Sequence, residues 1–256
     1  MLSKAKIKLI NSLSHKKYRD ESGLFVAEGV KTVRELLQYF PCEMLFATKE
    51  VTEIRDVTEV TDDELRKISF LKTPQGVLAV FRKCDMRYEI CDSRTSHIAH
   101  RTSHIAHRNT LSLALDCIQD PGNLGTILRI ADWFGIKDIF CSADCADVFN
   151  PKTVQATMGA LGRVRVHYAD LAELIRNTDL PVFGTFLGGE NIYRKQLPAH
   201  GLIVMGSEGN GISPEVEKLI GNRLFIPPYP IGAETSESLN VAVATAIVCA
   251  EFRRGI

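Results

Sequence analysis

The chain has 256 residues, of which 45% are hydrophobic, and its 31 Lys and Arg residues balance its 31 Asp and Glu residues. This length and apolar content suit one large or two smaller domains with a sizeable core. No stretch approaches the length of a membrane span, and the N-terminus lacks the apolar core of a signal peptide, so we expect a cytoplasmic protein. The seven cysteines form no Cys-x-x-Cys pair, which is typical of free thiols in a reducing compartment.

Zero net charge argues against general polyanion binding, but the positive charge is concentrated at the N-terminus. Residues 1–19 contain six Lys and Arg residues and no acidic residue. Tyr18 lies among Lys16, Lys17 and Arg19, and basic residues interleaved with an aromatic ring are typical of nucleic-acid contacts. A solvated helix face is the alternative. We predict that Lys16, Lys17 and Arg19 bind nucleic acid.

Residues 1–88 are predicted to form a small α/β domain. Apolar residues at helical spacing predict helices near the start of the chain and in two later segments, with buried strands between them. The later helices are expected at 30–40 and 62–70, a strand with its turn at 23–29, and further strands at 44–47 and 77–81.

Residues 89–110 are predicted to be a linker. They contain a perfect duplication, Thr-Ser-His-Ile-Ala-His-Arg at 95–101 and again at 102–108. Histidine clusters can bind metal, but no carboxylate or thiol completes a ligand set at this spacing. We therefore predict a tandem duplication in a tolerant loop, and no metal site.

Residues 111–256 alternate between short apolar runs and helical patterns. Such alternation predicts a parallel sheet with helices on both sides. The ligand site of such a sheet lies at the carboxyl ends of its strands. The strands are expected at 111–116, 136–141, 164–167, 182–187, 202–205 and 224–226.

Polar residues occur where three of these strands end. Asn123 and Arg129 follow the first strand, Glu208 follows the strand at 202–205, and Ser238 with Asn240 follows the last. Each alone is explained by a helix cap or a solvated side chain. Their shared position after buried strands of one sheet predicts a common site.

The turn at Glu208 has the order Gly206-x-x-Gly209-x-Gly211. This order matches neither the dinucleotide fingerprint nor the P-loop, so it argues against a nucleotide-dependent oxidoreductase. A carboxylate within the turn would repel a phosphate and suits a hydroxyl or a cationic ligand better.

The helix expected over 239–251 is apolar on nearly every face. Such a helix must be covered on all sides, either by its own chain or by a second subunit. Its many alanines would let another backbone come close.

At this point the sequence resembles the SpoU/TrmH-type RNA 2′-O-ribose methyltransferases of the SPOUT class. Three motifs in order carry the resemblance: Asp120-Pro-Gly-Asn123-Leu-Gly-Thr-Ile-Leu-Arg129, Ile203-Val-Met-Gly206-Ser-Glu208-Gly-Asn-Gly211, and Ile226-Pro with Ser238-Leu239-Asn240-Val-Ala-Val-Ala. The first domain resembles that family's substrate-binding domain, which is similar to L30e-like ribosomal-protein RNA binders. This second resemblance rests on Ser12-Leu-Ser-His-Lys-Lys-Tyr-Arg19, Phe25-Val-Ala-Glu28-Gly29 and Thr73-Pro-Gln-Gly76.

The resemblance implies an α/β SPOUT fold with a deep trefoil knot, which is rare among proteins. It implies that S-adenosylmethionine is held largely by backbone around Gly206, Ile226 and Leu239, with Thr185 nearby. It also implies that the final helix packs at a homodimer interface, and that the substrate is rRNA or tRNA.

The resemblance further implies a catalytic set of Arg129, Asn123, Glu208, Ser238 and Asn240. In the family the matching arginine has been proposed as the base. A guanidinium is effectively never deprotonated in proteins, so we expect Arg129 to grip a phosphate and to stabilise the developing alkoxide. The other four would orient Arg129 and the ribose.

Two features depart from the family pattern. The segment between Ile226 and Ser238 is longer than usual, which makes Ser236 a competing candidate for Ser238. The histidine duplication is not a family feature. The alternative function is a non-catalytic RNA-binding or ribosome-assembly protein on the same fold, and the complete set of polar site residues argues against it.

Overall fold

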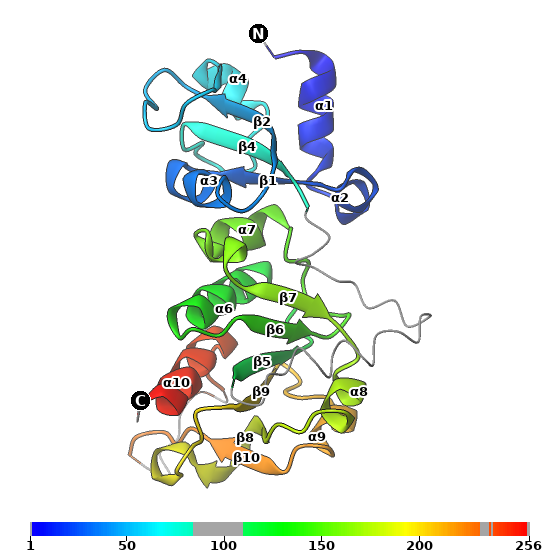
Figure 1. The fold of residues 1–256 in the computed structure, drawn as a ribbon, viewed down its shortest axis with the longest axis vertical. Coiled ribbons are helices and arrows are strands. Elements are labelled where there is room, and N and C mark those ends of the chain that lie inside the picture. The colour runs from blue at the N-terminus through cyan, green and yellow to red at the C-terminus, as the bar shows by residue number, and fades with distance from the viewer. Residues whose placement is uncertain (1, 84–109, 231–235, 237, 255–256) are drawn as a thin grey trace. The chain divides into compact units, whose positions relative to one another are not determined.

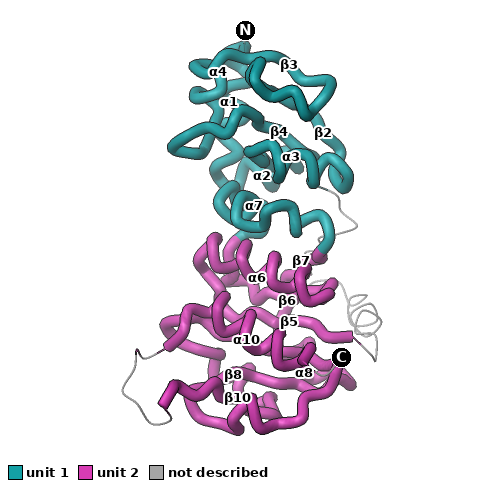
Figure 2. Tube along the Cα trace, turned by 90° about the vertical axis from the view of Figure 1, so that its left-hand side faces the viewer, with its two compact units in different colours: residues 1–86, 147–163 teal, residues 87–146, 164–256 magenta. Residues whose placement is uncertain are grey.

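The computed structural model describes residues 2–83, 110–230, 236 and 238–254. The histidine duplication and nearly all of the predicted linker lie outside these residues. The chain divides into two compact units (Figure 2). Unit 1 comprises residues 1–86 and 147–163, and unit 2 comprises residues 87–146 and 164–256.

Unit 1 is built on a four-stranded sheet with the strand order β1-β4-β2-β3. Strands β1 and β2 run antiparallel to β4, and the short β3, which was not predicted, runs parallel to β2. The elements of unit 1 are α1 (Lys4–Ser12), α2 (Lys16–Ser22), β1 (Leu24–Glu28), α3 (Val30–Leu36), β2 (Cys42–Ala47), β3 (Thr58–Glu59), α4 (Asp62–Arg66), β4 (Val77–Arg82), α7 (Pro151–Thr157) and the 3-10 helix η1 (Ala160–Gly162).

Alternate residues of β1 pack into two different hydrophobic cores, as expected for a strand that is covered on both faces. Val26 packs in an aliphatic cluster with residues of α1 and α4. Phe25 points the other way, and its ring lies 5.1 Å from Phe40, 5.5 Å from Phe81 and 4.8 Å from Phe149. Phe149 thereby joins the segment 147–163 to the core of unit 1.

Helix α7 is followed by two residues with left-handed backbone. Met158 and Gly159 both have positive φ angles, of 51° and 93°. A left-handed residue cannot continue a right-handed helix. The segment therefore ends α7 at Thr157 and starts a separate 3-10 turn.

Unit 2 holds a six-stranded sheet with the order β10-β8-β9-β5-β6-β7. Every neighbouring pair of strands is parallel, so the predicted α/β fold with a parallel sheet is confirmed. The elements of unit 2 are β5 (Leu111–Asp116), α6 (Pro121–Trp133), β6 (Asp138–Cys141), β7 (Arg165–Tyr168), α8 (Leu171–Arg176), β8 (Val182–Asn191), η2 (Ile192–Arg194), β9 (Gly201–Gly206), α9 (Pro214–Glu217), β10 (Asn222–Phe225) and α10 (Val241–Arg253).

Helices cover both faces of this sheet (Figure 1). Helices α6 and α10 pack against each other on one face. On the other face, residues of α8 and α9 form a core with Ala114, Leu202 and Val204 of the central strands. This three-layer arrangement buries all six residues of β5, including the polar Ser112 and Asp116.

The register of the two central strands sets the position of the turns that follow them. Asp116, the last residue of β5, pairs with Gly206, the last residue of β9. The turns after β5 and β9 therefore begin side by side at the carboxyl edge of the sheet.

Candidate active site

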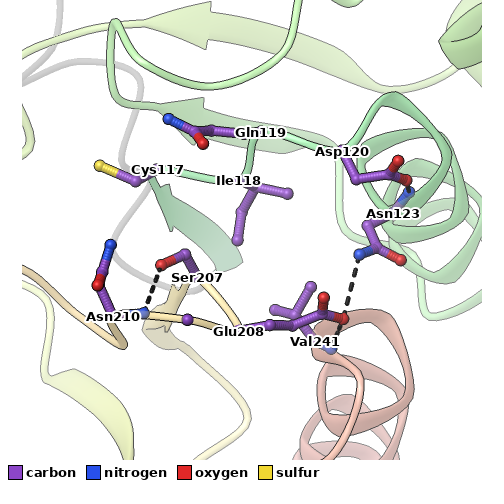
Figure 3. A pocket seen from close by; sticks show the side chains of 10 residues that line it. Cys117, Ile118, Gln119, Asp120, Asn123, Ser207, Glu208, Asn210 and Val241 are labelled. Carbon is purple, nitrogen blue, oxygen red and sulfur yellow. Dashed lines mark hydrogen bonds between the residues drawn. The ribbon is translucent and has the colours of Figure 1, made fainter.

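A pocket of about 200 Å³ opens where β5 and β9 end (Figure 3). Its walls come from the turn after β5, the start of α6, the turn after β9 and the start of α10. The lining residues are Cys117, Ile118, Gln119, Asp120, Asn123, Ser207, Glu208, Gly209, Asn210 and Val241.

Three of the predicted site residues meet at one end of this pocket. Glu208 Oε1 accepts hydrogen bonds from Asn240 Nδ2 at 2.6 Å, Asn123 Nδ2 at 3.2 Å and the Val241 backbone N–H at 3.1 Å. Asn240 Nδ2 also donates to Asn123 Oδ1 at 3.0 Å. Glu208 Oε2 accepts no hydrogen bond from the described part of the chain. The carboxylate is thus fixed through one oxygen while the other can accept a hydrogen bond from a ligand.

Asn240 acts as a helix cap and as a site residue at the same time. Its Oδ1 accepts from the backbone N–H groups of Ala242 and Val243, at 3.0 and 3.2 Å, which caps α10. Its Nδ2 is thereby oriented toward Glu208. The capping role that the sequence allows for this asparagine is confirmed, and its role in a functional site stays a prediction.

Asn123 is positioned by the first turn of α6. Asp120 is the N-cap of that helix, and its Oδ1 accepts from the Asn123 backbone N–H at 2.8 Å. Pro121 occupies the first helical position, where its lack of an N–H costs nothing. The cap and the proline fix where the helix begins and so place the Asn123 side chain at the pocket edge.

The turn after β5 is pinned by buried polar contacts. Asp116 is 3% exposed, and its Oδ2 accepts from the Ser213 backbone N–H at 2.7 Å, which ties this turn to the turn after β9. Cys117 has a left-handed backbone, with a φ of 57°, and its N–H donates to Ser142 Oγ at 2.9 Å. Burial raises the pKa of the Cys117 thiol, and the charge of Asp116 adds to the rise. The pocket wall therefore presents a neutral thiol.

Arg129 is not brought into this cluster. It lies six residues after Asn123 on α6, roughly 9 Å further along the axis and on a different face of the helix. Its side chain is exposed, does not line the pocket and forms no hydrogen bond or ion pair with the described residues.

The two candidate serines lie just ahead of α10. Ser236 and Ser238 are both exposed, and Ser236 Oγ donates to the Ser238 carbonyl at 3.4 Å. Within the described chain, Ser238 forms no hydrogen bond with Glu208.

Of the predicted cofactor residues, Thr185 lies within β8, and the other three lie at or next to the ends of elements. Thr185 follows the paired part of β8 and donates to Met205 Sδ at 3.7 Å, and Gly206 ends the neighbouring strand β9. Ile226 follows β10 and Leu239 precedes α10. A Cβ added to Gly206 would lie 2.1 Å from the Gly211 carbonyl carbon. Only glycine lets the two backbone segments approach so closely.

Lys16 and Lys17 lie on the surface of α2, with exposed fractions of 62% and 76% for their side chains. Arg19 does not. Its side chain is 1% exposed, pairs with Asp147 Oδ2 at 2.6 Å, and donates to the carbonyls of Leu13 and Ser14. The prediction that Arg19 contacts nucleic acid is wrong, because the guanidinium is buried and hydrogen-bonded within unit 1.

Gln119 and Asn210 line the pocket but were not singled out from the sequence. Both belong to the turns that follow buried parallel strands, so the rule that placed Glu208 could have found them. Among the described residues, no group of three or more His, Cys, Asp or Glu side chains could hold a metal ion. No helix in this part of the chain is long and apolar enough to cross a membrane.

Comparisons with known proteins agree with this geometry. The sequence model of the SpoU rRNA Methylase family matches residues 110–250, and that of the MRM3-like substrate binding domain matches residues 4–79. The chain therefore belongs to the SpoU rRNA methylase family.

Solved structures and a curated protein are similar over nearly the whole chain. A putative RNA methyltransferase of the TrmH family from Porphyromonas gingivalis is 40% identical over 100% of both chains, with a TM-score of 0.82. An AdoMet-bound rRNA methyltransferase from Sinorhizobium meliloti is 28% identical over 100% of this chain and 97% of its own, with a TM-score of 0.80. The 23S rRNA (guanosine(2553)-2′-O)-methyltransferase RlmP of Bacillus subtilis (strain 168) is 29% identical over 97% of this chain and 96% of its own.

Proposed function

We propose that the protein transfers a methyl group from S-adenosylmethionine to a ribose 2′-hydroxyl of rRNA or tRNA. The observation that carries this proposal is the hydrogen-bonded cluster of Asn123, Glu208 and Asn240, in a chain that belongs to the SpoU rRNA methylase family. The Sinorhizobium meliloti structure is named as AdoMet-bound and the Bacillus subtilis protein as a 2′-O-methyltransferase, which supports the same reaction here.

Thr185, Gly206, Ile226 and Leu239 are the residues that we assign to the cofactor. They fit it, because the set combines strand-end backbone, one hydroxyl and two aliphatic side chains, of which Leu239 is 46% exposed. Adenosine needs such apolar contacts and backbone hydrogen bonds rather than charged partners. When bound, S-adenosylmethionine supplies a methyl group on a positively charged sulfur, which is already a strong electrophile.

The protein's part in the reaction is mainly to position the ribose. Glu208 Oε2 accepts a hydrogen bond from a sugar hydroxyl, while Asn123 and Asn240 hold the carboxylate. One of the serines, Ser238 or Ser236, completes this set. Arg129 grips an RNA phosphate and stabilises the negative charge that develops on the 2′-oxygen as its proton passes to water.

We assign RNA capture to the N-terminal region, residues 1–88, as an L30e-like binding domain joined by the linker 89–110 to the methyltransferase domain 111–256. The match of residues 4–79 to a substrate binding domain supports this assignment. The exposed Lys16 and Lys17 are the proposed contacts. We also propose a cytoplasmic location.

We further propose that the protein is a homodimer through α6 and α10. Trp133 on α6 is 85% exposed and Val243 on α10 is 51% exposed, although both are large apolar side chains. The two helices that carry them pack together. Because Arg129 does not line the pocket of its own chain, the proposal places it at the pocket of the partner.

The finer fold that we propose is a trefoil knot formed by the C-terminal region. The match of residues 110–250 to the SpoU rRNA Methylase family supports it. Single-molecule stretching from both termini tests the knot, because a knotted chain stays shorter than its full contour length after unfolding.

The activity is tested by incubating the protein with tritiated S-adenosylmethionine and with total RNA from cells that lack this protein. The expected result is tritium in the RNA, recovered after digestion as a 2′-O-methylated nucleoside. Binding of cofactor and RNA without label would instead support a non-catalytic RNA-binding protein and overturn the proposal.

Arg129 acting on the partner's pocket is tested by mixing two inactive variants. Heterodimers of Arg129→Ala with Glu208→Ala are isolated with two affinity tags. Each heterodimer has one intact site if the arginine acts across the dimer, so about half of the wild-type rate is expected. An inactive heterodimer would show that Arg129 and Glu208 must belong to the same chain.

A further inference from the structure

The pocket has a second polar end that the ribose does not use. Figure 3 shows the carboxamides of Gln119 and Asn210 at the end near Cys117, away from the contact between Asn123 and Glu208. Both side chains are exposed, and neither forms a hydrogen bond with another residue of the described chain. They are therefore available to a ligand that already contacts Glu208.

Hydrogen bonds fix the backbone next to both carboxamides. Ile118, next to Gln119, is 2% exposed; its N–H donates to Cys145 Sγ at 3.3 Å and its carbonyl accepts from the Ala146 N–H at 2.8 Å.

On the other wall, the Asn210 backbone N–H donates to Ser207 Oγ at 3.2 Å. Ser207 and Gly211 also exchange two backbone hydrogen bonds, at 3.0 and 2.9 Å. Because the backbone is already fixed, only the two side chains remain to be ordered when a ligand binds.

The chemistry of this end selects a neutral, flat ligand with a hydrogen-bonding edge. None of the described residues that line the pocket is a Lys or Arg, and the acidic Glu208 disfavours a phosphate or the carboxylate of a methionine tail. Ile118 and Val241 supply buried apolar surface for a ring face. The cavity of about 200 Å³ is below the roughly 300–1,000 Å³ of pockets for drug-sized ligands, so it suits a single nucleoside.

We propose that Gln119 and Asn210 read the base of the target nucleotide, while the cluster around Glu208 holds its ribose. A carboxamide offers one donor and one acceptor side by side, which is the arrangement that discriminates base edges. Sequence-specific recognition of RNA uses such contacts on unstacked bases. This inference rests on the proposed methyl transfer and adds the residues that determine which base is accepted.

The experiment uses the full-length protein and four RNA transcripts. The position methylated by the wild type is mapped first on rRNA and tRNA transcribed in vitro. Four versions of that transcript then carry A, C, G or U at the mapped position, and kcat/KM for tritium transfer is measured on each. Gln119→Ala and Asn210→Ala are compared with Gln196→Ala, an exposed glutamine outside the pocket.

The wild type and Gln196→Ala are expected to prefer one base by roughly tenfold or more, the size of a typical side chain–base contact. Each pocket variant is expected to lose most of that preference, through a lower kcat/KM on the preferred base, while calorimetry shows an unchanged Kd for S-adenosylmethionine. Asn210→Asp, which loses the donor and keeps the acceptor, is expected to change which base is preferred rather than to abolish transfer.

The failures of the inference and of the function are distinguishable. A wild type that labels no RNA overturns the methyltransferase proposal itself. A wild type that labels all four transcripts equally, or pocket variants that keep the wild-type preference, overturns base reading and leaves the function standing. A weakened Kd for S-adenosylmethionine in the pocket variants, with base preference intact, assigns this end of the pocket to the cofactor and also overturns the inference.

Discussion

At the scale of single residues, burial decides what a charged side chain does. Arg19 and Lys16 lie on the same short helix, yet Arg19 is 1% exposed and Lys16 is 62% exposed at the side chain. Arg19 Nε and one terminal nitrogen both donate to Asp147 Oδ2, at 3.0 and 2.6 Å. This pair joins α2 to the segment 147–163 inside unit 1.

Asp147→Ala is expected to destabilise the protein strongly, because it leaves the Arg19 guanidinium buried without a counter-charge. Removing one partner of a buried pair costs about 3–5 kcal/mol. Urea unfolding followed by circular dichroism measures the loss. The matched control is Glu59→Ala, which removes an exposed pair with Lys49 in the same unit and should cost under about 1 kcal/mol. Equal midpoints for the two variants would show that the buried pair contributes nothing.

The sequence could not separate Arg19 from its lysine neighbours for a physical reason. Its partner lies 128 residues away, and no local pattern carries that information. Glu208, Asn123 and Asn240 were predictable because the carboxyl ends of parallel strands must share an edge. The position of Arg129 away from them follows from helix geometry alone, since six residues turn the side chain to another face.

At the scale of elements, the pairing of β6 with β7 places two basic side chains around the buried Asp138. Asp138 is 6% exposed. Its carboxylate accepts two hydrogen bonds from Arg165, at 2.7 and 2.6 Å, and Oδ1 also forms a hydrogen bond with His167 Nε2 at 2.9 Å. Burial pushes the Asp138 pKa up, but the hydrogen bonds of His167 and Arg165 together with the charge of Arg165 outweigh it, and the pKa is lowered from 3.8.

A lowered carboxyl pKa stabilises the fold at neutral pH and not in acid. The contribution is fully present above the unfolded value near 3.8 and is lost as the pH falls through the lower folded value. We expect Asp138→Asn to be less stable than the wild type at pH 6, and the gap between their unfolding free energies to shrink below pH 3.8. Urea titrations at several pH values measure the gap. A gap that stays constant into acid would exclude this carboxylate as its source.

At the scale of the whole molecule, the sequence predicted the layers better than the grouping of segments. Strand and helix alternation was enough for the parallel sheet of unit 2, because each period is local. The grouping of residues 147–163 with unit 1 depends on contacts such as Phe25 with Phe149, which connect distant parts of the chain. Only the folded structure brings such pairs together.

The exposed apolar residues of α6 and α10 lead to the last prediction. Trp133 and Val243 lie on helices that pack together in unit 2, and both are more than half exposed. Burying them in a second copy would remove apolar surface from water, whereas a carboxylate at that position would have to be desolvated. Val243→Asp is therefore expected to shift the protein from dimer to monomer, as measured by light scattering. The rate of methyl transfer should fall in proportion to the fraction of dimer lost.

Tyr18→Asp is the matched control, since Tyr18 is 46% exposed but lies on α2 of unit 1. It should remain dimeric, and its effect on activity should come from RNA affinity alone. The Val243→Asp monomer should still bind S-adenosylmethionine if its backbone contacts are intact, so calorimetry separates loss of the dimer from loss of the fold. A monomeric wild type would rule out both the interface and the action of Arg129 on a partner, because a single chain keeps that arginine outside its own pocket.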